Sequence, residues 1–171
     1  LVFSIVLYQT PESDLYNVLH SIEQFTSLVK IIFNHKLKVS TLLIDNHPST
    51  KYSILNKHQY SFEFIYRKSS VNLGYGRGHN SNFDLIDDGN EFIFITLNPD
   101  VSFTPLGLKP LIEYAIDNLS SVSCLAPLAY LKDGSIQYSV KDNPTILSLF
   151  VSRFSISQRI PFLKSYYRKY I

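Results

Sequence analysis

Apolar runs and helical repeats alternate along the first 126 residues of this chain. Short runs rich in β-branched and aromatic residues predict strands at 2–8, 39–44, 62–66, 92–97 and 123–126. Between them, apolar residues recur every three or four positions, which is the spacing of an amphipathic helix. The pattern therefore predicts an α/β fold, with a mostly parallel central sheet and helices on both faces.

Two of the predicted helices begin with a threonine and a proline, which suit the N-cap and the first helical position. For the helix after Thr10 and Pro11, the expected apolar face is Leu15, Val18, Leu19, Ile22, Phe25 and Val29. For the helix after Thr104 and Pro105, the expected buried face is Leu108, Leu111, Ile112, Ala115 and Ile116.

Further elements are predicted from weaker patterns. A short helix is expected at 49–57, and another at 78–88 with Phe83 and Ile86 facing the core. Beyond residue 126, Asp133 and Gly134 predict the turn of a hairpin with arms at 128–131 and 136–139. An apolar helix is expected at 145–154.

The composition limits the classes of function. The length of 171 residues suggests one domain or a large part of one, and 45% hydrophobic residues suffice for a core. A net charge of +2 is too small to indicate a nucleic-acid partner. No apolar run is long enough to span a membrane. Cys124 is expected to be a buried thiol. No Met occurs, even at position 1, so we expect part of a longer product.

Polar and aromatic residues follow the predicted strands, whose carboxyl ends should meet at one edge of the sheet. Open α/β sheets bind ligands at such edges. Tyr8 offers a face to a planar base, or is a core tyrosine. Asp45 can accept from a base or ribose, or cap the next segment. Asp100, in Asn98-Pro99-Asp100, can bind a metal or phosphate, or belong to a turn.

Three alternating glycines, Gly74, Gly76 and Gly78, precede the helix predicted at 78–88. Such a stretch lets the backbone approach an anion, but a tight turn explains it equally well. It lacks the spacing of a dinucleotide-binding loop and the Lys-Ser/Thr of a P-loop. Arg77 is either a phosphate partner or a solvated charge. The five histidines show no metal-ligand spacing, so each is expected to be structural or on the surface.

Taken in order, these residues resemble bacterial family 2 glycosyltransferases. The resemblance rests on Tyr8, on Ile44-Asp45-Asn46, on the stretch 72–80 and on Leu97-Asn98-Pro99-Asp100-Val101. It is strongest for rhamnosyltransferases of surface-polysaccharide assembly, to which the stretch 133–139 is also similar. It covers about residues 2–155. The glycine stretch and the Asn-Pro-Asp motif are fairly specific together, whereas each alone is not.

The resemblance implies a GT-A fold, in which a nucleotide-binding sheet is joined to an acceptor-binding part. It implies that Tyr8 and Asp45 hold the base of the donor. It implies that Asp100 binds Mg²⁺ or Mn²⁺. It also implies that Asn98 stands in place of the first carboxylate of the family's Asp-x-Asp motif. With one carboxylate fewer, metal binding would depend more on the donor phosphates. It places near ribose and diphosphate the residues Asn72, Gly74, Tyr75, Gly76, Gly78 and Asn80.

The expected function is metal-assisted, inverting transfer of a sugar in the cytoplasm. The resemblance implies deoxythymidine-diphosphate rhamnose (dTDP-rhamnose) as donor and a lipid-linked glycan as acceptor. The family's catalytic base lies in an acidic Glu-Asp motif beyond the Asn-Pro-Asp, and this chain has no such motif. The acids that follow Asp100 are Glu113, Asp117, Asp133 and Asp142.

Residues 1–155 are therefore expected to be an incomplete donor-binding domain, truncated on its C-terminal side. Residues 156–171 form a basic aromatic tail or the start of the acceptor-binding part. The tail is a solvated linker or, alternatively, a peripheral contact with the acidic inner face of the membrane.

Two other functions stay open. A non-catalytic nucleotide-sugar-binding module, or one that needs another chain, would share the site without transferring sugar. A nucleotidyltransferase would need a glycine-rich triphosphate loop with a Lys directly after the first strand. The residues Gln9-Thr10-Pro11 do not supply such a loop.

Overall fold

The computed structural model describes residues 1–56, 60–86, 89, 91–131 and 133–137. It divides the chain into two compact units, Leu1–Ser121 and Val122–Ile171, and each is described by itself. The predicted boundary near residue 155, the helix at 145–154 and the basic tail lie outside the described residues.

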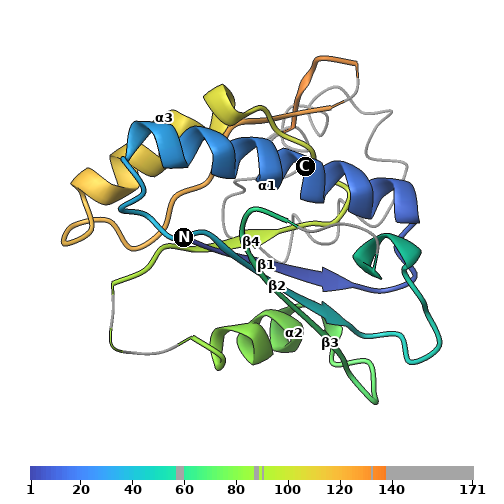
Figure 1. Cartoon of the computed structure of the whole chain (residues 1–171). Coiled ribbons are helices and arrows are strands. Elements are labelled where there is room, and N and C mark those ends of the chain that lie inside the picture. The colour runs from blue at the N-terminus through green and yellow to red at the C-terminus, as the bar shows by residue number, and fades with distance from the viewer. Residues whose placement is uncertain (57–59, 87–88, 90, 132, 138–171) are drawn as a thin grey trace, which may run out of the picture. The chain divides into compact units, whose positions relative to one another are not determined.

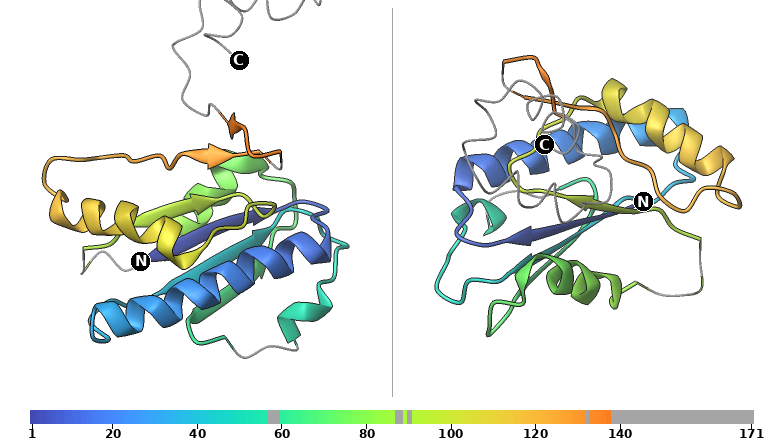
Figure 2. Two further views of the ribbon diagram at one scale, coloured as in Figure 1. Left: turned by 90° about the horizontal axis from the view of Figure 1, so that it is seen from above. Right: turned by 180° about the vertical axis from the view of Figure 1, so that it is seen from behind.

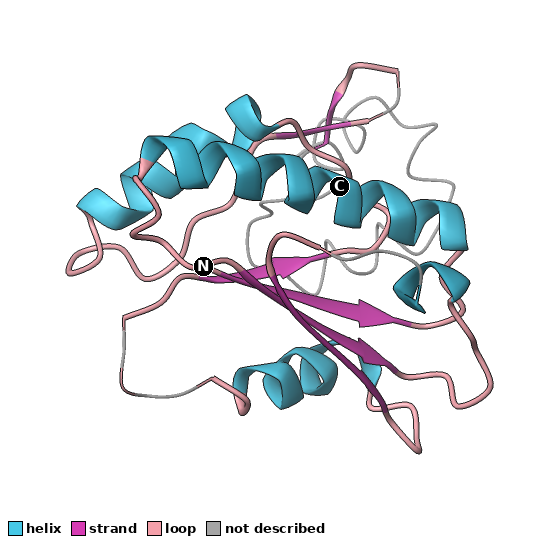
Figure 3. Cartoon of the chain, in the orientation of Figure 1, coloured by secondary structure: helices cyan, strands magenta, loops and turns pink. Residues whose placement is uncertain are grey.

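The first unit alternates strands and helices in the predicted order (Figure 1, Figure 3). Its elements are β1 (Val2–Leu7), α1 (Glu12–Ile32), β2 (Ser40–Asp45), the 3-10 turn η1 (Ser53–Asn56), β3 (Glu63–Lys68), α2 (Gly74–Phe83), β4 (Phe94–Leu97) and α3 (Pro105–Asp117).

The described strands of this unit form one parallel sheet with the order β3-β2-β1-β4. Asp45 at the end of β2 pairs with Leu7 on β1 and with Lys68 on β3. On the other side, Leu97 ends β4 opposite Ile5, whereas β1 continues to Leu7. Since all strands run the same way, their carboxyl ends lie at one edge, as predicted.

Helices cover both faces of this sheet, as the alternating pattern predicts. Figure 1 shows α1 and α3 on one face and α2 on the other, and the right view of Figure 2 shows the same three layers from behind. All six residues expected on the apolar face of α1 are buried. Phe103, just before α3, stacks on Phe3 and meets Phe25 edge to face. This aromatic cluster packs α1 and the segment before α3 against β1.

The two predicted threonine caps have different outcomes. Thr104 caps α3, and its hydroxyl accepts from the Gly107 N–H at 3.1 Å. Of the expected face of α3, Leu108 and Ile112 are buried and the others are half-buried. Thr10 does not cap α1, which starts after Pro11 without a side-chain cap. Its hydroxyl instead accepts from the Tyr8 N–H at 3.4 Å, because the chain turns sharply between them.

The helix predicted at 78–88 starts earlier, so the prediction of a glycine loop is wrong. Gly74–Phe83 is α2, and the glycines lie in its first two turns. Gly78, His79 and Asn82 are the buried residues, so the face toward the sheet is polar or without a side chain. For this reason the prediction for Phe83 is also wrong: its side chain is 46% exposed and meets Phe92 and Phe94 edge to face.

The apolar run before Asn98 forms a shorter strand than predicted, Phe94–Leu97. The residues of β4 are half-buried or exposed, since β4 is the outermost strand of the described sheet.

In the second unit, the expected strand at 123–126 does not form, and Cys124 is exposed instead of buried. The described part of its backbone there pairs with no neighbouring strand. The predicted hairpin is present as β5 (Ala129–Tyr130) and β6 (Ile136–Gln137), which pair antiparallel around Asp133 and Gly134. Among the helices described, none is long and apolar enough to cross a bilayer.

Candidate functional site

Asp45, the last residue of β2, anchors the loop that follows it. The residue is 0% exposed. Its Oδ1 accepts from the backbone N–H of His47 at 2.9 Å, and its Oδ2 accepts from the hydroxyl of Tyr66 on β3 at 3.1 Å. Burial raises the pKa of Tyr66, and the neighbouring Asp45 carboxylate raises it further. The hydroxyl therefore stays protonated and keeps donating, which fixes the carboxylate and, through it, the position of His47.

Tyr8 stands at the end of β1, next to this loop. Its side chain is 51% exposed, and its ring meets the His47 ring edge to face, with centroids 5.6 Å apart. The next residue, Gln9, has φ of 50°, a left-handed conformation that is uncommon for a residue other than glycine. Its side-chain nitrogen lies 3.2 Å from Nε2 of His47. The loops after two neighbouring strands are thus joined by side chains.

The start of α2 is tied to the same edge. The side-chain amide of Asn46 donates to the carbonyl of Gly74 at 3.0 Å, and Oδ1 of Asn72 accepts from the Gly74 N–H at 2.8 Å. Gly74 has φ of 73°, which a glycine adopts without strain. A Cβ at Gly74 or at Gly76 would meet no atom within 4 Å. The helix therefore begins with an open backbone beside β2, and the N–H groups of its first turn have no partner inside the helix.

Tyr75 and Gly78 connect α2 to the strands. The hydroxyl of Tyr75 is hydrogen-bonded to Thr96 on β4, and its ring packs against His79 with centroids 4.4 Å apart. Gly78 is buried, and a Cβ there would lie 2.8 Å from Cγ2 of Val6. Gly78 thus has a packing role in addition to the ligand contact predicted for it. Asn80 is exposed.

A buried polar network lies under α2. Oγ of Ser4 lies 2.7 Å from Nδ1 of His79, and the Asn82 amide donates to this Oγ and to the carbonyl of Leu42, each at 2.9 Å. Arg67 on β3 donates to Oδ1 of Asn82 at 3.2 Å. Burial lowers the pKa of His79, which favours the neutral ring. This network fixes the position of α2 against β1 and β2.

Asn98 and Asp100 lie in a turn that directly follows β4, where the Val101 N–H donates to the Asn98 carbonyl at 3.3 Å. Both side chains are exposed. Their carboxylate and amide oxygens are hard ligands of the kind that Mg²⁺ and Mn²⁺ take. In the part of the chain that is described, no three His, Cys, Asp or Glu side chains are grouped to hold a metal. A cation at this turn would need most of its ligands from a phosphate and water.

The structure describes three of the four acids that follow Asp100 in the sequence. Glu113 forms an ion pair with Lys109 within α3, with 2.6 Å between Oε1 and Nζ. Asp117 is the last residue of the same helix and is exposed. Asp133 accepts from Ser135 inside the hairpin turn of the second unit, and these bonds lower its pKa. Asp142 lies outside the described residues.

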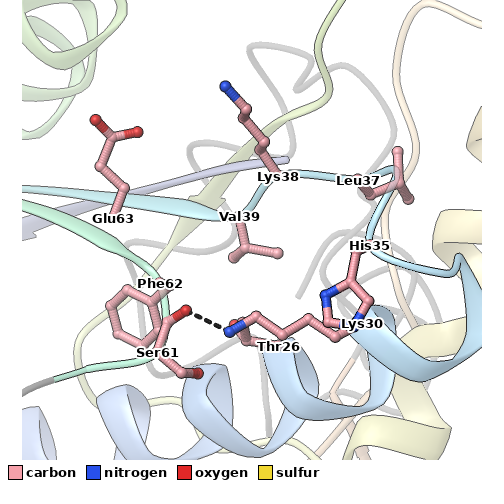
Figure 4. A pocket seen from close by; sticks show the side chains of 9 residues that line it. All are labelled: Thr26, Lys30, His35, Leu37, Lys38, Val39, Ser61, Phe62 and Glu63. Carbon is pink, nitrogen blue, oxygen red and sulfur yellow. Dashed lines mark hydrogen bonds between the residues drawn. The ribbon is translucent and has the colours of Figure 1, made fainter.

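A cavity of about 250 Å³ lies elsewhere, at the opposite end of the strands (Figure 4). It is bounded by the C-terminal end of α1 and by the residues where β2 and β3 begin, and Lys30 crosses it to donate to the Ser61 carbonyl at 2.7 Å. Its lining residues are Thr26, Lys30, His35, Leu37, Lys38, Val39, Ser61, Phe62 and Glu63. None of the predicted site residues lines it.

No protein-family model matches the chain, and no curated protein is found to match it. The chain is similar to two crystal structures of S. aureus TarS. For TarS 1-349 the TM-score is 0.50 at 12% identity, over 74% of this chain and 38% of that one. For the other TarS structure the TM-score is 0.52 at 14% identity, over 77% of this chain and 24% of that one.

TarS has the GT-A glycosyltransferase fold. The chain described here has the GT-A fold as well. It spans less than half of either TarS chain. At this identity the likeness concerns the GT-A fold, in which the four parallel strands and α2 form the edge described above.

The structure brings Tyr8, Asp45, Asn72 and Gly74 to one edge, and the Asn98–Asp100 turn follows the outermost strand at that same edge. Two side chains there were not singled out from the sequence, Gln9 and His47. His47 follows Asp45 by two positions, so its place after a strand was a usable signal. No signal in the sequence could have indicated the left-handed backbone of Gln9, because glutamine has no preference for that conformation.

Proposed function

We propose that this chain is the donor-binding part of a glycosyltransferase that uses a nucleotide diphosphate sugar to build a cell-surface polysaccharide. The observation that carries the proposal is the joined edge of the GT-A sheet, where the loops after β1 and β2 and the start of α2 are held together by Tyr8, His47 and Asn46. The exposed ring of Tyr8 suits the base, and the open start of α2 suits the phosphates. The turn that contains Asp100 suits a cation.

In this proposal the base lies on the exposed ring of Tyr8, and Asp45 supports the loop beside it. The diphosphate lies toward α2, where Gly74 and Gly76 leave the backbone open and the helix dipole favours an anion. Tyr75 and Asn80 belong to the same helix. The Asn98–Asp100 turn would supply oxygen ligands for Mg²⁺ or Mn²⁺. Such a cation neutralises negative charge on a departing diphosphate.

The donor proposed is dTDP-rhamnose and the acceptor a lipid-linked glycan, both on the resemblance of the sequence motifs. The general base that must deprotonate the acceptor hydroxyl is assigned to a part of the enzyme outside the described residues. The reason is that the acidic Glu-Asp motif implied by the resemblance does not occur after Asp100 in this sequence.

The test is calorimetric titration of the 171-residue chain with dTDP and UDP, with and without Mn²⁺. We expect binding that is tighter with Mn²⁺, and an accompanying rise in the melting temperature, because a ligand that binds only the native state stabilises it. Absence of binding by every nucleoside diphosphate, in a chain whose circular dichroism shows it to be folded, would refute the proposal.

A second candidate is a nucleotide-sugar-binding module without transferase activity, which is favoured by the lack of a Glu-Asp motif after Asp100 in the given sequence. Transfer of labelled rhamnose by this chain and by a C-terminally extended one separates the two functions. Activity that appears only with the extension supports the glycosyltransferase. Donor binding without transfer in either form supports the module.

A further inference from the structure

We propose that Gln9 and His47 select the base of the nucleotide, and that they favour a base whose pairing edge carries an N–H beside a carbonyl, such as uracil or thymine. This inference rests on the proposed function and assigns a base class to the same site. It begins from Asp45, whose carboxylate is fully buried and already accepts from the His47 N–H and the Tyr66 hydroxyl. Polar groups that a base on Tyr8 could reach must come from other residues.

Gln9 is placed for this contact. It follows Tyr8 directly and is exposed. Its φ of 50° costs energy for a residue with a Cβ, and backbone outliers of this kind gather at binding sites. The turn is held by the bond from the Tyr8 N–H to Thr10 Oγ1. The strained turn therefore carries an amide, which can donate and accept at once, next to an exposed aromatic face.

His47 determines whether the nitrogen or the oxygen of the Gln9 side-chain amide faces a ligand. The nitrogen Nε2 of Gln9 can only donate, so Nε2 of His47, 3.2 Å away, must accept. With Nε2 as the acceptor, the ring proton lies on Nδ1, which donates to Oγ1 of Thr50 at 2.9 Å. The position of the ring is itself set by Asp45, through the His47 N–H. Gln9 thus points its nitrogen at His47, and among the described residues no group donates to its carbonyl oxygen, which can therefore accept from a ligand.

A fixed acceptor distinguishes bases of similar size. Uracil and thymine carry a proton on N3 and can donate to the Gln9 oxygen, while the second amide N–H of Gln9 donates to a neighbouring carbonyl. Cytosine has no proton on N3, so the same arrangement places two acceptors against each other. An unpaired polar group in such a contact costs more than the bond itself contributes. The chain should therefore bind UDP and dTDP more tightly than CDP, by about tenfold or more.

Two variants separate the role of Gln9 in selecting the base from the role of His47 in orienting the Gln9 amide. Gln9→Gly removes the amide and suits the left-handed backbone, so the fold should be kept. We expect it to bind UDP, dTDP and CDP with similar affinity. His47→Phe keeps a ring against Tyr8 but removes the acceptor, so the Gln9 amide can rotate. We expect its preference for UDP over CDP to fall by about threefold or more, since one oriented hydrogen bond is lost.

The experiment is calorimetric titration of the wild type, both variants and the surface controls Gln24→Ala and His20→Ala with UDP, dTDP and CDP in Mn²⁺. Both controls change exposed residues of α1 and should keep the wild-type preference. An unchanged preference in Gln9→Gly, or CDP bound as tightly as UDP by the wild type, overturns the inference while the proposed function stands. If no nucleoside diphosphate binds the wild type, both fail.

Discussion

Gly78 on α2 and Val6 on β1 lie so close that a Cβ at position 78 would be 2.8 Å from Cγ2 of Val6 and 3.0 Å from its Cγ1. Both residues are buried, and Val6 belongs to the strand that carries Tyr8. The contact brings the open start of α2 to the edge of the sheet.

Replacing Gly78 by Ala should destabilise the chain. The added methyl overpacks the contact with Val6, which costs about 1–3 kcal/mol, and the better helix propensity of Ala offsets about 1 kcal/mol of this. Gly76→Ala is the matched control, because a Cβ there meets nothing within 4 Å. It should be neutral or stabilising by up to about 1 kcal/mol. Urea unfolding measures both, and equal midpoints for the two variants would contradict the packing role.

Asn82→Ala should also be destabilising. Asn82 is fully buried and donates to Ser4 Oγ and to the Leu42 carbonyl. Truncation removes two hydrogen bonds to buried groups, although Ser4 Oγ keeps its contact with His79, so we expect a loss of about 1–3 kcal/mol in all. Asn80→Ala, on the exposed side of the same helix, should change the free energy of unfolding by less than about 0.5 kcal/mol. A similar loss in both variants would show that the network does not hold α2.

The stability of the chain should fall in mild acid through His79. Burial lowers the pKa of His79 in the folded chain below its ordinary value of 6.5. Below that value the unfolded chain binds a proton that the folded chain does not, so stability decreases as pH falls from 6.5 toward the folded pKa. The contribution is at most one proton, about 1.4 kcal/mol per pH unit.

His79→Gln tests this, because glutamine stays neutral and can still bond to Ser4. Urea unfolding from about pH 7.5 to about pH 5 should show a steeper loss for the wild type than for the variant. His20→Gln, on the exposed face of α1, should follow the wild type. Parallel curves for the wild type and His79→Gln would refute the effect.

Asp100→Asn should weaken the metal-dependent part of donor binding. The side chain is exposed, so the melting temperature should not change. The variant loses the charged oxygen that we propose as a metal ligand, and we expect the gain in dTDP affinity on adding Mn²⁺ to fall by about tenfold, or about 1.4 kcal/mol. Asp117→Asn, an exposed carboxylate at the end of α3, is the control. If the Asp100→Asn variant kept the full Mn²⁺ dependence of dTDP binding, Asp100 would not be a metal ligand.

The parts of the fold that were predicted from the sequence are those with a local periodic signal. The face of α1 repeats every three or four residues, and all six predicted residues are buried. The face of α2 could not be found in this way, because Gly78, His79 and Asn82 pack on the sheet by shape and hydrogen bonds. Their partners, Ser4 and Leu42, are distant in the sequence.

The site was predicted only as far as strand ends can be located. The positions of Tyr8 and Asp45 at one edge followed from parallel strands. The burial of Asp45 and the pairing of Gln9 with His47 did not, because they depend on loop conformations set by Thr10 and Tyr66. Thr10 and Thr104 carry the same local signal, and only the tertiary setting decides that one caps a helix and the other closes a turn.

The strand order has a consequence for measurement at this edge. β1 lies between β2, which ends at Asp45, and β4, which leads to Asp100. Two strand spacings, roughly 10 Å, therefore separate β2 from β4, near whose ends the base and the cation are proposed to bind. That distance is set by backbone hydrogen bonds and by no side chain. Substitutions in the loops that follow β2 and β4 should therefore change the groups at the two strand ends without changing the spacing between the strands.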